Sequence, residues 1–269
     1  MKYAVQDKLL HSSGYLETFK RAEQLNFDGV EITAIGGALN EEITKEIITA
    51  SNQTGLVPSA ICGGYRNWIG DFNKEKRLEA VEDIGISLRF AKEMGAGGVI
   101  APAAYGMFSK KLPPFQPPRD EQGDKGDLLD SLNRIVEHAE RYNINLFVEP
   151  LNRYEDHMMN TVEQAVALMK EVGSDRLKVM ADFFHMSIEE ENIDQTISEY
   201  ANFIGYYHLA DSNRYQPGKG HTDFQSYIKS IQQTKYQGYL SFECGLKGDV
   251  YEALQVSLAY LKSLETVIN

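Results

Sequence analysis

Short apolar runs alternate with longer amphipathic segments along nearly the whole chain. The short runs are typical of buried strands, and the longer segments repeat apolar residues at the spacing of a helix. Strands are expected at residues 2–5, 27–32, 55–62, 97–103, 145–149, 177–182, 203–208 and 239–243. Helices are expected at residues 14–25, 41–54, 74–94, 128–142 and 249–267, with shorter ones between the later strands.

Local signals refine some of these boundaries. Thr161, Ser187 and Thr222 are each followed three residues later by Glu or Gln, the capping-box pattern that begins a helix. Pro58 has no backbone N–H, so pairing of the third strand is expected to begin after it. The loop between the fourth strand and the fourth helix, residues 104–126, is long and irregular, and such loops often act as lids. We expect a lid over the mouth of the fold.

Strict alternation of strand and helix predicts a single (β/α)₈ TIM barrel. One catalytic domain is expected over residues 1–269, because no linker or change of composition divides the chain. An open doubly wound sheet is the alternative. It is disfavoured because the first strand is not followed by a Gly-x-Gly-x-x-Gly turn.

Charge and hydropathy restrict the class of partner. A formal net charge of −12 disfavours unaided binding to nucleic acid or to an anionic membrane. The chain has no apolar run of membrane-spanning length and does not begin like a secretory signal. Cys62 and Cys244 match neither a metal motif nor a disulfide framework. These features indicate a cytoplasmic enzyme or binding protein.

The last four predicted strands all end on a residue that can bind a metal. These residues are Glu149, Asp182, His208 and Glu243. Strand ends of a barrel converge at its C-terminal face, so the four side chains are expected to meet. Three carboxylates and one imidazole suit Mn²⁺, Co²⁺, Mg²⁺ or Zn²⁺. One such residue alone is more often a salt-bridge partner or a helix cap, but four at equivalent positions favour a metal site.

The motifs at these strand ends resemble a known superfamily. They read EPLNRYE at residues 149–155, DFFHM at 182–186, HLADSNR at 208–214 and FE at 242–243. Together they resemble the xylose-isomerase-like sugar isomerase/epimerase superfamily, and within it the D-tagatose and D-psicose 3-epimerase group. The resemblance implies a small-molecule sugar substrate and one divalent metal, most often Mn²⁺ or Co²⁺, held by Glu149, Asp182, His208 and Glu243. It also implies a homodimer or homotetramer.

The resemblance further implies a reaction and a set of contacts. Glu149 and Glu243 would act as an acid/base pair that inverts C3 of a ketose or keto-sugar through a metal-stabilised enediolate. Glu155, His185 and Arg214 match positions that contact the sugar. From the residues alone, other readings stay open. Arg214 can pair with Asp211 and Glu155 with Arg153, while His185 can bond the first turn of its helix. Cys62, Tyr65 and Trp68 follow the third strand and are candidates for the pocket wall.

Four other functions remain as alternatives. Aldose–ketose isomerisation, as by a hydroxypyruvate isomerase, and isomerisation or dehydration of a keto-inositol would use the same chemistry. An endonuclease-IV-like nuclease shares the Asp-x-x-His pattern but needs histidines after the third and fourth strands, where this chain has none. A non-catalytic sugar-binding barrel would be expected to lack at least one of the metal-binding residues, and all four are present in this chain. The expected lid differs in sequence from that of the ketose epimerases, which leaves open whether the substrate carries a phosphate or a glycosidic group.

Overall fold

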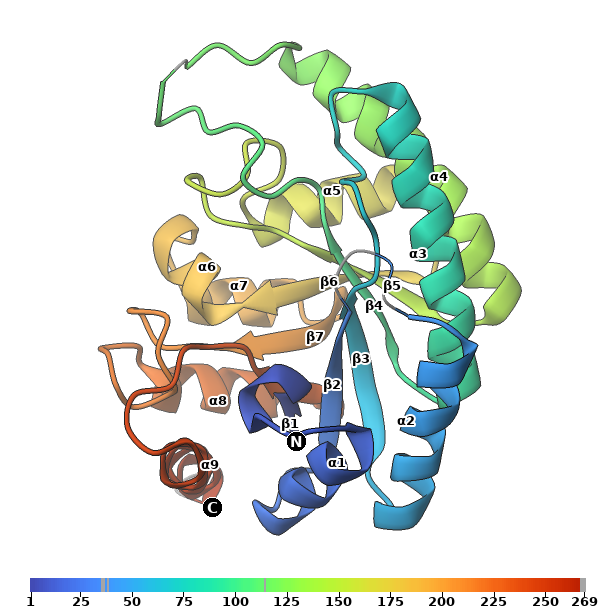
Figure 1. The fold of residues 1–269 in the computed structure, drawn as a ribbon. Coiled ribbons are helices and arrows are strands. Elements are labelled where there is room, and N and C mark those ends of the chain that lie inside the picture. The colour runs from blue at the N-terminus through green and yellow to red at the C-terminus, as the bar shows by residue number, and fades with distance from the viewer. Residues whose placement is uncertain (35–36, 38, 114, 267–269) are drawn as a thin grey trace.

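Eight parallel strands form a closed barrel in chain order, with helices around the outside (Figure 1). The computed structural model describes residues 1–34, 37, 39–113 and 115–266. The predicted (β/α)₈ barrel is confirmed. The strands are β1 (Lys2–Gln6), β2 (Gly29–Ala34), β3 (Val57–Gly63), β4 (Gly98–Pro102), β5 (Asn145–Glu149), β6 (Leu177–Asp182), β7 (Ile204–Leu209) and β8 (Tyr239–Phe242).

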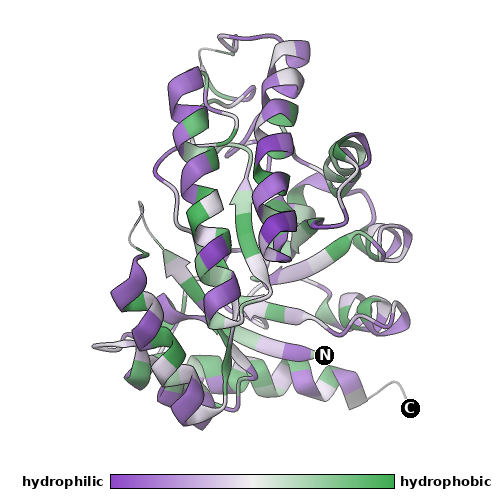
Figure 2. Cartoon of the chain, turned by 90° about the vertical axis from the view of Figure 1, so that its right-hand side faces the viewer, coloured by the Kyte–Doolittle hydropathy of each residue, from purple (hydrophilic) through white to green (hydrophobic). Residues whose placement is uncertain are grey.

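The helices follow the strands and cover the barrel. Figure 2 shows that they carry both polar and apolar residues, as expected for helices packed on one side and exposed on the other. Among the described residues, no helix is both long and apolar enough to cross a membrane. The helices are η1 (Asp7–Leu10), α1 (Tyr15–Gln24), α2 (Glu41–Thr54), α3 (Lys74–Met94), α4 (Glu121–Tyr142), α5 (Val162–Val172), α6 (Phe183–Glu189), α7 (Ile193–Glu199), α8 (Phe224–Gln233) and α9 (Val250–Thr266).

A small apolar cluster, separate from the main core, sets the floor of the site. Side chains two residues apart along a strand lie on the same face. Three of the predicted metal ligands each follow a member of this cluster by two residues, so they share its face one layer nearer the C-terminal end of the barrel. The cluster consists of Ala60, Ile100, Phe147, Met180 and Tyr206.

The predicted caps are confirmed at one of three positions. Thr161 begins α5 with both hydrogen bonds of a capping box. Ser187 is inside α6, which begins at once from β6 with Asp182 as its N-cap. Thr222 lies one residue before the true cap of α8, Asp223, because the backbone N–H of Thr222 donates to Asp211 instead (3.0 Å). In both cases a carboxylate, that of Asp182 or Asp223, accepts the N-cap hydrogen bond that the sequence pattern assigned to a hydroxyl.

Two other boundaries differ from expectation. Pro58 lies within β3 and is paired with Val30, so the prediction that pairing begins after Pro58 is wrong. Helix α4 begins at Glu121, capped by Asp120, rather than at residue 128. The first turns of α4 are polar and have no apolar stripe, which is why the sequence pattern placed the start of the helix too late. The irregular segment therefore ends at residue 120. The predicted end of the last helix, residue 267, lies outside the described residues.

Candidate active site

The four predicted ligands meet at the C-terminal end of the barrel. One ligand atom from each of Glu149, Asp182, His208 and Glu243 lies within 4.8 Å of the others. The first three are buried and Glu243 is partly buried. In the part of the chain that the structure describes, this is the one such group of His, Cys, Asp or Glu residues. The four side chains that the sequence pattern picked out at the strand ends therefore lie together in the structure.

His208 is oriented by a buried carboxylate from the other side of the barrel. Its Nε2 atom lies 3.0 Å from Oε2 of Glu31, on β2. Glu31 also accepts hydrogen bonds from Gln6 Nε2 (2.7 Å) and Tyr206 Oη (2.9 Å). His208 Nδ1 is buried and lies 3.0 Å from Oε2 of Glu243, without the alignment of a hydrogen bond. In metal-binding histidines, one ring nitrogen typically bonds a carboxylate, and this contact orients the other ring nitrogen toward the metal site.

The charges of the cluster also fit a cation. Burial, aided by Glu243, raises the pKa of Glu149 well above its ordinary value. Burial acts on Glu243 in the same direction, but His208, Arg214 and Lys8 outweigh it and hold the pKa of Glu243 well below its ordinary value. Burial lowers the pKa of His208, and Glu31 and Glu243 outweigh that effect and raise it. To hold all three carboxylates ionised in so small a buried volume requires added positive charge. The residues present therefore fit a divalent metal ion.

Arg214 connects two of the candidate ligands. Its Nη1 atom donates to Asp182, and its Nη2 atom donates to Oε2 of Glu243 (2.8 Å). The guanidinium lies 4.7 Å from the centre of the Phe184 ring. Burial lowers the pKa of Arg214, but Asp182 and Glu243 outweigh it and raise it above its ordinary value. Arg214 therefore does not pair with Asp211, whose carboxylate accepts backbone N–H groups of its own loop.

His185 presents one ring nitrogen to the cluster. Its Nδ1 atom accepts a hydrogen bond from the backbone N–H of Asn152 (3.1 Å), so Nε2 carries the proton. Nε2 lies 3.6 Å from Asp182, 3.8 Å from Glu149 and 3.9 Å from Glu155. Burial lowers the pKa of His185, which favours the neutral ring. Glu155 stays free of Arg153, because Arg153 pairs with Glu189 (2.8 Å).

The candidate substrate contacts border a cavity of about 570 Å³ above the cluster. Such a volume is within the range of small-molecule sites, roughly 300–1,000 Å³. Trp68 lies between Tyr65 and Tyr105 on one wall, with ring centres 5.5 and 6.0 Å away. Tyr105 belongs to the predicted lid. The backbone N–H of the following residue, Gly106, donates to the backbone oxygen of Glu155 (2.8 Å). The predicted residues on the wall are Cys62, Tyr65, Trp68, Glu149, Glu155, His185, Arg214 and Glu243.

Three residues of the site were missing from the sequence prediction. Glu31 and Gln6 lie beneath the cluster, and Lys8 lies at its mouth with Nζ 3.9 Å from Oε1 of Glu243. Glu31 had a usable signal, since it is an acid between the apolar residues Val30 and Ile32 of a predicted strand. Gln6 is the last residue of β1 and Lys8 lies in η1, and neither had such a signal.

Comparisons with known proteins agree with this geometry. The xylose isomerase-like TIM barrel family matches residues 19–264. The 3-dehydro-D-guloside 4-epimerase of Escherichia coli is 37% identical over 264 residues, covering 98% of this chain and 100% of that protein. The crystal structure of a 3-keto-D-glucoside 4-epimerase from E. coli superimposes with a TM-score of 0.94 at 37% identity, covering 98% of this chain and 99% of that one.

A second group of relatives matches part of the chain. The D-psicose 3-epimerase of Agrobacterium fabrum is 36% identical over 129 residues, which is 48% of this chain and 45% of that protein. All of these relatives are epimerases, a class of isomerase. The chain is an enzyme of the isomerase class and belongs to the xylose isomerase-like TIM barrel family.

Proposed function

We propose that this enzyme is a divalent-metal-dependent epimerase that inverts the carbon next to the ketone of a keto-sugar. The observation that carries the proposal is the placement of Glu149 and Glu243 in one cluster that could hold a metal ion, on the wall of a substrate-sized cavity. Proton transfer to and from carbon needs a base and an acid within hydrogen-bond reach of that carbon, and two carboxylates meet this need.

The chemistry divides between a cation and the side chains. Glu149, Asp182, His208 and Glu243 would hold the ion, which when bound would polarise the ketone and stabilise negative charge on its oxygen. We propose Mn²⁺, because three carboxylate oxygens and one imidazole suit it. One of the two glutamates removes the proton next to the ketone, and the other delivers a proton to the opposite face. Inversion of the carbon follows.

His185 and Arg214 would bind the oxygens of the reacting unit. The neutral His185 ring offers an Nε2–H donor, and Arg214 offers a guanidinium that is already fixed by Asp182 and Glu243. Donors held in place before the reaction stabilise charge that develops on oxygen during it. Glu155, 3.9 Å from His185, would accept a hydrogen bond from a sugar hydroxyl.

For the substrate we propose a glycoside with its ketone at C3, inverted at C4. The support is the relative that matches 98% of the chain, a 3-dehydro-D-guloside 4-epimerase. Inversion at C3 of a free ketose is the second candidate, supported by the partial match to a D-psicose 3-epimerase. Both place the reacting proton next to a ketone, so the same side chains serve either substrate.

Deuterium incorporation tests the function directly. The enzyme is incubated with Mn²⁺ in D₂O, with a methyl 3-keto-glucoside in one sample and a free ketose in another, and the products are followed by NMR. We expect the C4 epimer of the keto-glycoside, with deuterium at C4. Deuterium at C3 of the ketose would favour the second candidate. A proton shift between C1 and C2, or loss of water, would indicate an isomerase or a dehydratase, and no exchange with any substrate would refute the proposal.

Chelation of the metal is expected to abolish turnover, and added Mn²⁺ to restore it. A ligand at a hundred times its Kd stabilises the folded state by about 2.7 kcal/mol, which raises Tm by roughly 5 °C or more in a chain of this size. The measurement is Tm by calorimetry with and without each cation. Asp182→Asn is expected to lose the shift, whereas Glu189→Gln, a carboxylate outside the cluster on the following helix, should keep it. An unchanged Tm of the wild type with Mn²⁺, Co²⁺, Mg²⁺ and Zn²⁺ would contradict a metal site.

A further inference from the structure

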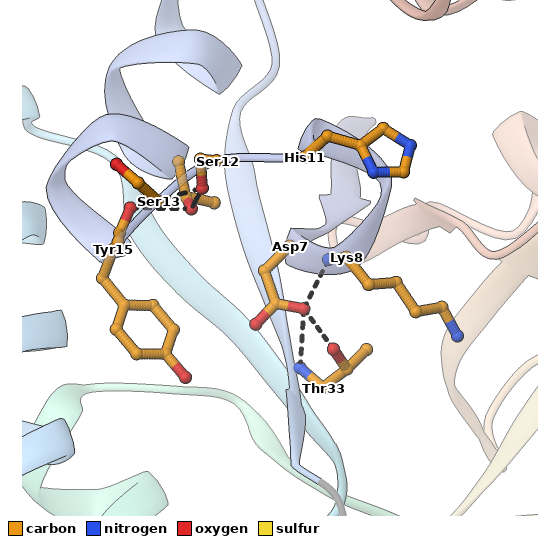
Figure 3. Close-up of a pocket in the computed structure, with 9 residues that line it drawn as sticks. Asp7, Lys8, His11, Ser12, Ser13, Tyr15 and Thr33 are labelled. Atoms are coloured by element: carbon orange, nitrogen blue, oxygen red, sulfur yellow. Dashed lines mark hydrogen bonds between the residues drawn. The ribbon is translucent and has the colours of Figure 1, made fainter.

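A second cavity adjoins the first at the C-terminal ends of β1 and β2. Its volume is about 310 Å³, and it shares Lys8 and Thr33 with the wall of the main cavity (Figure 3). A substrate group that extends from the reacting sugar past Lys8 would therefore enter this second cavity. The function proposed above assigns it no role. Its wall includes Asp7, Lys8, His11, Ser12, Tyr15 and Thr33.

The carboxylate of Asp7 is fixed through one oxygen. Its Oδ1 atom accepts from the backbone N–H groups of Lys8 (2.7 Å) and Thr33 (3.1 Å) and from the hydroxyl of Thr33. No donor among the described residues is hydrogen bonded to its Oδ2 atom, and that atom is not fully enclosed by protein. In Figure 3 the carboxylate lies between Tyr15 and Lys8, with the second oxygen clear of all dashed lines. Asp7 thus offers a preoriented acceptor to a ligand.

Tyr15 supplies a second free polar group on the same wall. Its ring packs against the hydrophobic core, and its hydroxyl makes no hydrogen bond within the part of the chain that the structure describes. The loop before α1 is held in shape by Arg21, whose Nη1 donates to the backbone oxygens of Leu10 (2.6 Å) and His11 (2.7 Å). The cavity therefore has a fixed wall that carries the carboxylate of Asp7 and the phenol of Tyr15.

We propose that this cavity is the subsite for the aglycone of a keto-glycoside, and that it prefers a neutral group with several hydroxyls, such as a second sugar unit. A sugar hydroxyl donates to Oδ2 of Asp7, and another accepts from or donates to Tyr15. The carboxylate of Asp7 disfavours an anionic aglycone, and the ammonium group of Lys8 on the same wall already lies 3.9 Å from Oε1 of Glu243. This proposal rests on the proposed function, because it assumes that the main cavity holds the reacting sugar.

The test compares two substrates that share the reacting unit. One is a 3-keto-disaccharide whose oxidised unit is the non-reducing sugar, and the other is the corresponding methyl 3-keto-glycoside. We expect the wild type to have a higher kcat/KM for the disaccharide. Asp7→Asn keeps an oxygen for Lys8 and Thr33 but replaces the free acceptor with an NH₂ donor. It is expected to lower the ratio of the two kcat/KM values about tenfold, the loss of one hydrogen bond to a charged group.

Two further variants complete the design. Tyr15→Phe keeps the ring and should lower the same ratio severalfold. Asp28→Asn is the matched control, because Asp28 also accepts a backbone N–H between β1 and β2 (2.8 Å, from Tyr3) but at the opposite end of the barrel. It should leave the ratio unchanged. An equal loss on both substrates in Asp7→Asn, or no preference of the wild type for the disaccharide, would overturn the subsite.

Binding without turnover separates this inference from the proposed function. The non-oxidised disaccharide and methyl glycoside are titrated into the Mn²⁺-loaded enzyme by calorimetry. We expect tighter binding of the disaccharide in the wild type and not in Asp7→Asn. If no keto-sugar is turned over, the proposed function fails, and this titration still decides whether the subsite exists. Preferential binding of a disaccharide phosphate over the neutral disaccharide would also overturn the proposal.

Discussion

Replacing Glu149 with glutamine is expected to lower kcat by about a thousandfold. General acid–base catalysis by one positioned side chain contributes roughly 10²–10⁴-fold, and an amide cannot take or give the proton. Glutamine keeps the size of the side chain and one oxygen for the metal. Glu243→Gln should cause a loss of similar size. Steady-state rates of epimer formation, with metal content measured on the same samples, give the comparison.

The two variants should differ in which epimer they deprotonate. If Glu149 and Glu243 act on opposite faces of the carbon, each variant retains the base for one epimer only. In D₂O, Glu149→Gln should exchange the proton of one epimer and Glu243→Gln that of the other, with inversion slow in both. Glu189→Gln is a control, since its carboxylate bonds Arg153 away from the cluster. Exchange of the same epimer in both variants would contradict the two-base arrangement.

The fold and the four metal-binding candidates were predictable because they depend on local patterns. Strand runs and helical periodicity gave the order of elements, and in a barrel that order alone sets where strand ends meet. Glu149, Asp182 and His208 each occupy the last or next-to-last position of a strand, and Glu243 comes just after β8. Their convergence therefore needed no information on side-chain contacts.

Contacts between distant elements were not predictable in the same way. The alternatives for Arg214 and Glu155 could be settled only by knowing that Glu189 lies beside Arg153 and that Asp182 and Glu243 lie beside Arg214. The carboxylate that orients His208 lies 177 residues earlier in the chain. The cap of α8 was misplaced for a related reason, because Asp211 binds the backbone of Thr222 across a loop.

Glu31 is expected to be needed for both stability and metal binding. Its carboxylate is fully buried and accepts from Gln6, Tyr206 and His208. Glu31→Ala leaves these donors without their acceptor, so we expect a loss of roughly 3–5 kcal/mol in the free energy of unfolding, as for a broken buried ion pair. Because the carboxylate also orients the His208 ring, Glu31→Gln should weaken metal binding about 10–100-fold.

The two effects can be separated by a milder variant in the same network. Tyr206→Phe removes one hydrogen bond to Glu31 but leaves the contact between Glu31 and His208 in place. It is expected to cost about 1 kcal/mol of stability and to leave metal affinity within a few-fold of the wild type. Urea unfolding and metal titration of the apo enzyme measure the two quantities. Wild-type metal affinity in Glu31→Gln would show that the ring is held in place without this carboxylate, and the orienting role would then fall to the barrel packing around His208.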